Sequence, residues 1–131
     1  MKRDENCIFC KIISNEVPSY KVYEDPEFFG FLTIKPLTKG HMLLVPKNHS
    51  EDILVMDSDE YLHMMMIAKT MAEKIKGLFN PARVSMMVVG LEVAHTHLHI
   101  FPTDKIENIN PQSAYDATKE ELSEVQNLYL N

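Results

Sequence analysis

Residues 93–102 read VAHTHLHIFP, and three of the six histidines of the chain occupy every second position there: His95, His97 and His99. This spacing matches the two-residue period of a β-strand, in which successive side chains point to opposite faces of the sheet. A helix would turn His97 away from the other two histidines. The stretch therefore predicts a strand with three imidazoles on one face, ended by Pro102 because proline lacks a backbone N–H.

Length and charge exclude several classes of protein. The 131 residues suit one domain that buries a core without disulfide bonds. A formal net charge of −6 argues against a general DNA- or RNA-binding protein, which would carry a broad basic surface. The sequence shows neither a signal peptide nor a run of about 18 apolar residues, as a membrane span requires. We therefore expect a single cytoplasmic domain, over residues 1–131, that binds neither nucleic acid polymers nor membranes.

The first half of the chain predicts a short helix followed by strands. Apolar residues at positions 8, 9, 12 and 13 suit an amphipathic helix that ends near residues 14–15. Residues 21–24 and 28–34 are predicted to be two strands of a hairpin, because turn-forming residues separate them. Residues 41–45 are predicted to form a third strand, which Pro46 stops.

The second half predicts the longest helix and two further strands. Asp57 can cap a helix that reaches about Phe79, and Glu60 completes a capping box. Residues 84–89 predict a fourth strand, and the histidine stretch makes a fifth. Thr118 can cap a terminal helix. Consecutive strands with one helix crossing over are typical of an α+β fold: a single antiparallel sheet of about five strands, with one long helix and short terminal helices.

The only two cysteines form a Cys-x-x-Cys pair, Cys7 and Cys10, which can supply two of the four ligands of a structural zinc ion. His49 and one histidine of the 95–99 stretch would complete a closed Cys₂His₂ site. A redox pair of the thioredoxin type should follow a strand, and no strand is predicted before Cys7. Two unligated thiols are the third alternative.

If zinc takes one histidine of the stretch, two remain free on the same face. A neutral imidazole can attack phosphorus, and neighbouring donors can stabilise charge on the phosphate oxygens. The sequence contains no Walker loop, no glycine-rich nucleotide fingerprint and no serine in a nucleophile turn. The histidine stretch is therefore the candidate site for phosphoryl or nucleotidyl transfer.

The segment HTHLHIF, residues 95–101, resembles the signature of the histidine triad (HIT) superfamily, in which three histidines alternate with mostly apolar residues. The likeness extends to CIFCKII at 7–13, to GHMLLVPKNH at 40–49 and to Gly90, in the same order and spacing. It covers a core of about residues 7–102 and leaves residues 103–131 as a C-terminal tail with a helix. The chain is most similar in these motifs to the zinc-containing bacterial-type HIT hydrolases.

The resemblance implies an antiparallel sheet with flanking helices, paired edge to edge in a homodimer. It also implies a hydrolase or transferase that cleaves a nucleoside monophosphate from a purine nucleotide derivative, of the phosphoramidate or dinucleoside polyphosphate type. His97 would attack the α-phosphorus to give a nucleotidyl-histidine intermediate, and His99 would contact the phosphate. The implied ligands of a structural Zn²⁺ are Cys7, Cys10, His49 and His95. The implied nucleotide-binding residues are Ile8, Phe9, Phe31, Thr33, Glu92, His97 and His99.

Departures from the family pattern leave two alternatives open. Thr33 stands where many members have an aspartate that binds the ribose hydroxyls, and Leu91 and Glu92 follow Gly90 where Gln-Ser or Gln-Thr is common. A nucleotide-binding or scaffold module with little turnover is one alternative. The other is a three-histidine catalytic zinc centre, in which His97 would be a ligand.

Overall fold

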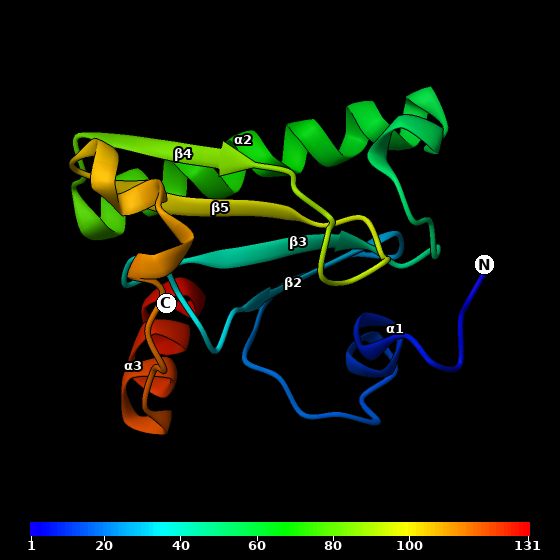
Figure 1. Ribbon diagram of the computed structural model, residues 1–131, viewed down its shortest axis with the longest axis horizontal. Coiled ribbons are helices and arrows are strands. Elements are labelled where there is room, and N and C mark those ends of the chain that lie inside the picture. Colours follow the sequence, from blue (N-terminus) through cyan, green and yellow to red (C-terminus); the bar gives the residue numbers. More distant parts are fainter.

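One antiparallel sheet organises the chain, and its five strands lie in the order β1-β2-β3-β5-β4 (Figure 1). The computed structural model describes all residues, Met1–Asn131. The strands are β1 Lys21–Glu24, β2 Phe28–Leu32, β3 Met42–Pro46, β4 Arg83–Met87 and β5 Leu98–Thr103. The helices are α1 Ile8–Ile13, the long α2 Ser58–Phe79 and α3 Lys119–Leu130, with short 3₁₀ helices η1 Ile53–Val55, η2 Ile106–Ile109 and η3 Pro111–Ser113. The predicted α+β class is confirmed.

Both faces of the central strands are covered, so β2 and β3 are buried along their whole length. Successive side chains of a strand point to opposite faces. On one face Leu98 and Ile100 belong to a core shared with α2 and α3. On the other face Phe31 packs in a second core with Phe9 of α1. Because His99 lies between Leu98 and Ile100 along β5, its side chain points to the α1 side of the sheet.

Local sequence signals set the ends of the helices. The Sγ of Cys7 accepts the Cys10 N–H at 3.4 Å at the start of α1. Thr118 caps α3 as predicted, because its hydroxyl oxygen accepts the Glu121 N–H at 3.1 Å. The capping box predicted for α2 is wrong, since the Asp57 side chain makes no capping hydrogen bond. Acidic residues in the first turn of α2 complement the helix dipole instead.

The histidine stretch is only partly a strand, which corrects the expectation from its alternating pattern. β5 begins at Leu98, and residues 91–97 form bends and coil without strand pairing. The register of β3 with β5 covers only Leu98 to Ile100. Of the three alternating histidines, His99 alone therefore lies in a strand.

Two residues of the loop before β5, His95 and Thr96, are hydrogen-bonded to the end of β3 and to the chain that follows it. The Thr96 N–H donates to the Ser50 carbonyl at 2.7 Å, and His95 Nε2 lies 2.8 Å from the Pro46 carbonyl oxygen. In a regular strand, His95 would share one face with His97 and His99. The loop conformation instead directs His95 at Cys7, while the rings of His97 and His99 stay together.

Pro102 lies inside β5 and does not end it, contrary to expectation. The strand continues to Thr103, and Pro102 pairs with Val84 of β4. Its carbonyl accepts the Thr38 hydroxyl at 2.7 Å, on the side of β3, where strand pairing has already ended at Ile100. The N and C=O groups of a strand residue point to the same side, so the missing N–H of proline costs no ladder hydrogen bond.

The remaining strands lie close to their predicted positions, although β2 ends at Leu32 and β4 at Met87, two residues before their expected ends. The C-terminal segment completes the main core, because α3 buries Leu122, Val125 and Tyr129 there. The hydrophobic core thus extends beyond residue 102. None of the helices combines the length and the apolar composition that spanning a membrane requires.

Candidate active site and metal centre

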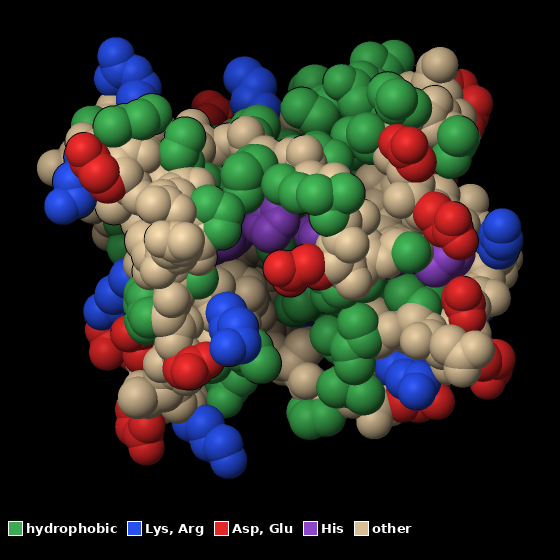
Figure 2. Space-filling view, in the orientation of Figure 1, with side chains coloured by type: hydrophobic (Ala, Val, Ile, Leu, Met, Phe, Trp, Pro, Cys, Tyr) green, Lys and Arg blue, Asp and Glu red, His purple; other side chains and the backbone are tan.

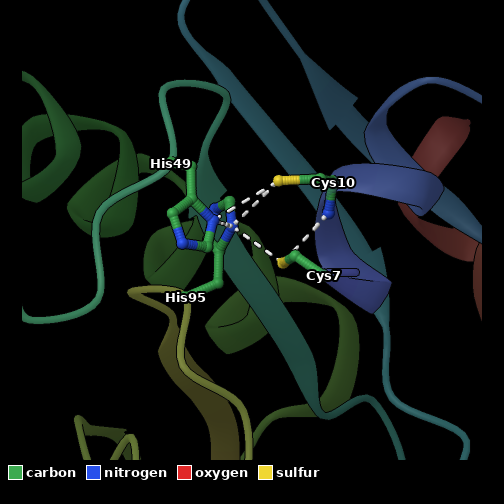
Figure 3. Close-up of side chains that lie close together, drawn as sticks. All are labelled: Cys7, Cys10, His49 and His95. Carbon is green, nitrogen blue, oxygen red and sulfur yellow. Dashed lines mark hydrogen bonds between the residues drawn. The ribbon is translucent and has the colours of Figure 1, made fainter. Parts of the chain in front are cut away.

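Four metal-ligating side chains converge from three segments: the start of α1, the chain after β3 and the loop before β5 (Figure 3). These residues, all of them buried, are Cys7, Cys10, His49 and His95. Their ligand atoms lie within 4.8 Å of one another. The sulfur of Cys7 is 3.3 Å from His95 Nδ1, and that of Cys10 is 3.4 Å from His49 Nδ1. The structure therefore brings together the predicted quartet.

The protonation of the quartet fits a bound metal ion. The Pro46 carbonyl can only accept, so His95 carries its proton on Nε2 and directs the Nδ1 lone pair at the cysteines. Burial lowers the pKa of His95 to about 4, which keeps the imidazole neutral, as a ligand must be. Burial also raises the pKa of the Cys7 thiol. A thiolate at this position needs a nearby positive charge, which a metal ion would supply.

His97 lies beside this cluster but outside it. Its Nδ1 is 2.7 Å from the backbone carbonyl oxygen of His95. A carbonyl cannot donate, so a neutral His97 carries its proton on Nδ1 and keeps the lone pair on Nε2. The ligand group includes neither His97 nor His99, and this arrangement does not favour the three-histidine zinc centre. Because His97 donates to the backbone carbonyl of His95, the orientation of its ring depends on the position of His95.

A fifth histidine, His41 directly before β3, fixes the tautomer of His99. The Leu37 N–H donates to His41 Nδ1 at 3.0 Å, so a neutral His41 carries its proton on Nε2. That nitrogen lies 2.9 Å from His99 Nδ1. His99 Nδ1 must then accept, and the proton of His99 is on Nε2. Burial and the neighbouring His99 lower the pKa of His41 to about 3.

Burial and the neighbouring His97 lower the pKa of His99 to about 4, so this imidazole is also neutral near pH 7. The rings of His97 and His99 are 5.1 Å apart. A neutral His97 therefore offers the lone pair of Nε2, and His99 offers its Nε2–H, close to each other. Sequence reasoning missed His41, and the only signal was its position next to Gly40 in the 40–49 motif.

Some of the predicted nucleotide-binding residues lie next to the histidines, and others show no contact with them. Phe9 is buried and lies edge-on to both His97 and Phe31, at ring distances of 5.0 Å and 5.5 Å. Ile8 is 42% exposed at the start of α1. Thr33 is half-buried in the loop after β2, and its Oγ1 accepts the Lys35 N–H at 3.1 Å.

Glu92 is exposed in the bend before β5, and its side chain makes no hydrogen bond or ion pair. The structure thus places Phe9, Phe31 and the two triad histidines, His97 and His99, together, whereas it shows no contact of Thr33 or Glu92 with them.

Figure 2 shows histidine side chains in a hollow near the centre of one face, bordered by hydrophobic groups and by acidic atoms. His99 is half-buried, whereas His97 is only 6% exposed.

The HIT domain family model matches residues 14–106. A HIT-like protein from Borreliella burgdorferi is 41% identical over 107 residues, which cover 76% of this chain and 77% of that protein. The Saccharomyces cerevisiae protein named adenosine 5′-monophosphoramidase is 36% identical over 100 residues, which cover 76% of this chain and 63% of that protein. The chain therefore belongs to the HIT family.

A solved structure of a Zn-bound histidine triad family protein from Mycobacterium smegmatis has the same fold. Its TM-score is 0.77 with 24% sequence identity, and the match covers 95% of this chain and 94% of that one. The family expected from the motifs at 7–13, 40–49 and 95–101 is thus confirmed. The matched domain ends at residue 106, before η3 and α3.

Proposed function

We propose that this protein is a hydrolase or transferase that cleaves a nucleoside monophosphate from a purine nucleotide derivative through a nucleotidyl-His97 intermediate. The observation that carries the proposal is the Nδ1–H of His97 donating to the His95 carbonyl, which leaves Nε2 free to attack. Membership of the HIT family and the name of the yeast relative support a substrate of the phosphoramidate type, and a dinucleoside polyphosphate is the alternative that we carry over from the sequence motifs. Detection of the covalent intermediate, described at the end of the Discussion, tests the proposal.

The reaction would proceed in two displacements. His97 Nε2 attacks the α-phosphorus, and the leaving group departs with the bonding electron pair and takes a proton from solvent, to which the attacking water of the second step returns one. His99 donates its Nε2–H to an oxygen of the phosphoryl group, while His41 holds it in that tautomer. Water or another acceptor then attacks the nucleotidyl-histidine and regenerates neutral His97. The first step requires a lone pair on His97 Nε2, and both steps use the Nε2–H of His99, which agrees with the tautomers that the hydrogen bonds favour.

The base and the sugar would lie on the α1 side of the sheet. Phe9 and Phe31 offer an apolar wall next to His97, and Ile8 can extend this wall because it is exposed. Thr33 would hydrogen-bond a ribose hydroxyl. Glu92, from the bend before β5, would approach the phosphate or the leaving group. The neutral Thr33 and the acidic Glu92 lead us to expect weaker nucleotide binding than in members with the usual residues.

Thr33→Asp is expected to tighten binding of a purine ribonucleotide by about 1 kcal/mol, roughly fivefold in Kd, because a charged acceptor strengthens the ribose hydrogen bond. Titration calorimetry measures the change. Thr70→Asp, on the exposed side of α2, is the matched control and should leave Kd unchanged. Equal or weaker binding by Thr33→Asp would show that the sugar lies elsewhere.

The Cys₂His₂ quartet would hold one structural Zn²⁺, whose chemistry is to fasten the N-terminal segment to the sheet through four bonds. The Zn-bound relative from Mycobacterium smegmatis supports this choice of metal. His95 would contribute twice, with Nδ1 to the metal and with its carbonyl to His97. A filled site would therefore also hold the nucleophile in its orientation.

A homodimer would pair the β4 edges of two copies. β4 has a strand neighbour on one side only, and apolar side chains are exposed along it and just beyond it, including Met86 at 40%, Val88 at 41% and Val89 at 49%. A second copy related by a two-fold axis would cover both the unpaired edge and these side chains. The same apolar surface continues to η2, where Ile106 is exposed.

Light scattering is expected to give twice the mass of the chain. Met86→Arg should raise the dimer dissociation constant at least about tenfold, because it places like charges close to the two-fold axis and buries them. Leu54→Arg, at an exposed apolar position of η1 outside this edge, is the control. A wild-type protein that is monomeric at every concentration would exclude the dimer.

A further inference from the structure

The C-terminal segment, which lies beyond the matched HIT domain, makes five polar contacts with one loop of that domain, besides the hydrogen bond from the Gln126 side chain to the Lys21 carbonyl of β1 at 3.0 Å. The loop is residues 33–41, which connects β2 to β3 and ends at His41. Two backbone hydrogen bonds and three side-chain contacts join them: Ala117 N–H to the Ile34 carbonyl at 3.1 Å, Tyr115 N–H to the Pro36 carbonyl at 3.1 Å, Lys35 to Asp116 at 2.9 Å, Lys39 to Glu124 at 3.0 Å, and the Tyr129 hydroxyl to the Gly40 carbonyl.

Tyr129 makes the most enclosed of these contacts. Its side chain is 1% exposed, in the last turn of α3. Burial raises the pKa of its hydroxyl, which therefore stays protonated and donates to Gly40. This hydrogen bond is the only side-chain link between α3 and the residue that directly precedes His41.

Gly40 is confined from the other side as well. Its φ is +103°, a conformation that residues with a Cβ rarely adopt, and a Cβ at this position would lie 2.7 Å from the Phe79 ring. The main chain at Gly40 is therefore held between the end of α2 and the end of α3. A displacement of this carbonyl must pass directly to His41.

Two hydrogen bonds fix the orientation of the His41 ring in the site. It accepts from the Leu37 N–H at 3.0 Å and directs its Nε2 at His99 Nδ1 at 2.9 Å. A small rotation of its ring would lengthen the second bond and free His99 Nδ1 to carry a proton. The N–H that faces the transferred phosphoryl group would then be lost from part of the population.

We propose that Tyr129 is a positioning residue: by holding the Gly40 carbonyl it keeps His41 as the donor to His99, and so keeps the His99 proton on Nε2. The role of that proton rests on the proposed function, whereas the tautomer itself does not. The C-terminal helix is accordingly part of the catalytic apparatus of this chain, although it contacts no substrate.

Tyr129→Phe removes the hydroxyl and keeps the ring in the core. Tyr115→Phe is the matched control, because its hydroxyl also serves the C-terminal segment but donates to Glu121 at 2.6 Å. Long-range ¹H–¹⁵N NMR of the imidazoles reports the tautomers. We expect a single Nε2–H form of His99 in the wild type and in Tyr115→Phe, and averaged ¹⁵N shifts for His99 in Tyr129→Phe.

With a nucleoside phosphoramidate as the probe, kcat of Tyr129→Phe should fall about tenfold with KM unchanged. An unchanged His99 tautomer in folded Tyr129→Phe would overturn the proposal, whatever the melting temperature, and would leave Tyr129 as the partner of a buried carbonyl. If this variant does not fold, the wild type decides, since mixed His99 tautomers with the Tyr129 hydrogen bond intact would also overturn the proposal. Absence of turnover in the wild type would contradict the proposed function and leave the NMR test intact.

Discussion

His97→Ala is expected to form no nucleotidyl adduct and to turn over at least about 10⁴-fold more slowly than the wild type. The reason is that a covalent mechanism without its nucleophile keeps only the contributions of binding and of the neighbouring donors. The variant should keep its fold and its metal, because His97 is outside the ligand quartet. Single-turnover kinetics with an adenosine phosphoramidate, metal analysis and thermal unfolding measure the three properties.

His63→Ala is the control for removal of an imidazole, since this partly exposed histidine of α2 binds Glu27 and Asp25 away from the site. It should keep full activity. His99→Ala should be intermediate and lose about 10²-fold in rate, because it keeps the nucleophile and loses one donor. Loss of metal from His97→Ala would favour the three-histidine zinc centre, and near-normal turnover would require a different nucleophile.

The protein is expected to bind one zinc ion per chain, and Cys10→Ser is expected to lose this ion and to lower the free energy of unfolding by on the order of 4 kcal/mol. Removing one ligand opens a closed four-ligand site, and the binding energy of the metal is part of the folding energy. The loss of stability should be smaller than in zinc fingers, because two hydrophobic cores remain. Metal analysis of purified protein and chemical unfolding measure both changes.

Cys7→Ser and His95→Ala should behave in the same way, since each removes one ligand. Ser14→Ala, just past the end of α1, is the control and should retain the metal. Retention of zinc after replacement of both cysteines would exclude the proposed ligand set. His95→Ala keeps the backbone carbonyl, so any slower adduct formation in that variant would report the disorder of the loop that carries His97.

Elements with a local signal could be predicted from the sequence. α1, β1 and α3 depend on a short apolar pattern bounded by turn or cap residues, and each lies within about one residue of its expected position. The start of β5 could not be read locally, because three alternating histidines look like a strand whether or not a neighbour pairs with them. The hydrogen bonds of Thr96 and His95 to distant carbonyls decide the conformation there.

Ligand counting could anticipate Cys7, Cys10, His49 and one histidine of the 95–99 stretch, and the resemblance to the HIT family singled out His95. The geometry then brought the predicted histidines together. His41 could not be anticipated in the same way, since its partner His99 is 58 residues away and its own neighbours are apolar. The tautomers of the histidines depend on backbone groups such as the Leu37 N–H, which carry no signal in the amino-acid sequence.

The most direct test of the central claim is the mass of the intact protein after mixing with a reactive purine nucleotide analogue, such as an adenosine 5′-phosphorimidazolide. The account predicts a mass increase of one nucleoside monophosphate per chain, which peptide mapping places on His97 and which is absent in His97→Ala. An adduct on another residue, or rapid hydrolysis of the analogue without any adduct on quenched samples, would contradict the nucleotidyl-His97 mechanism.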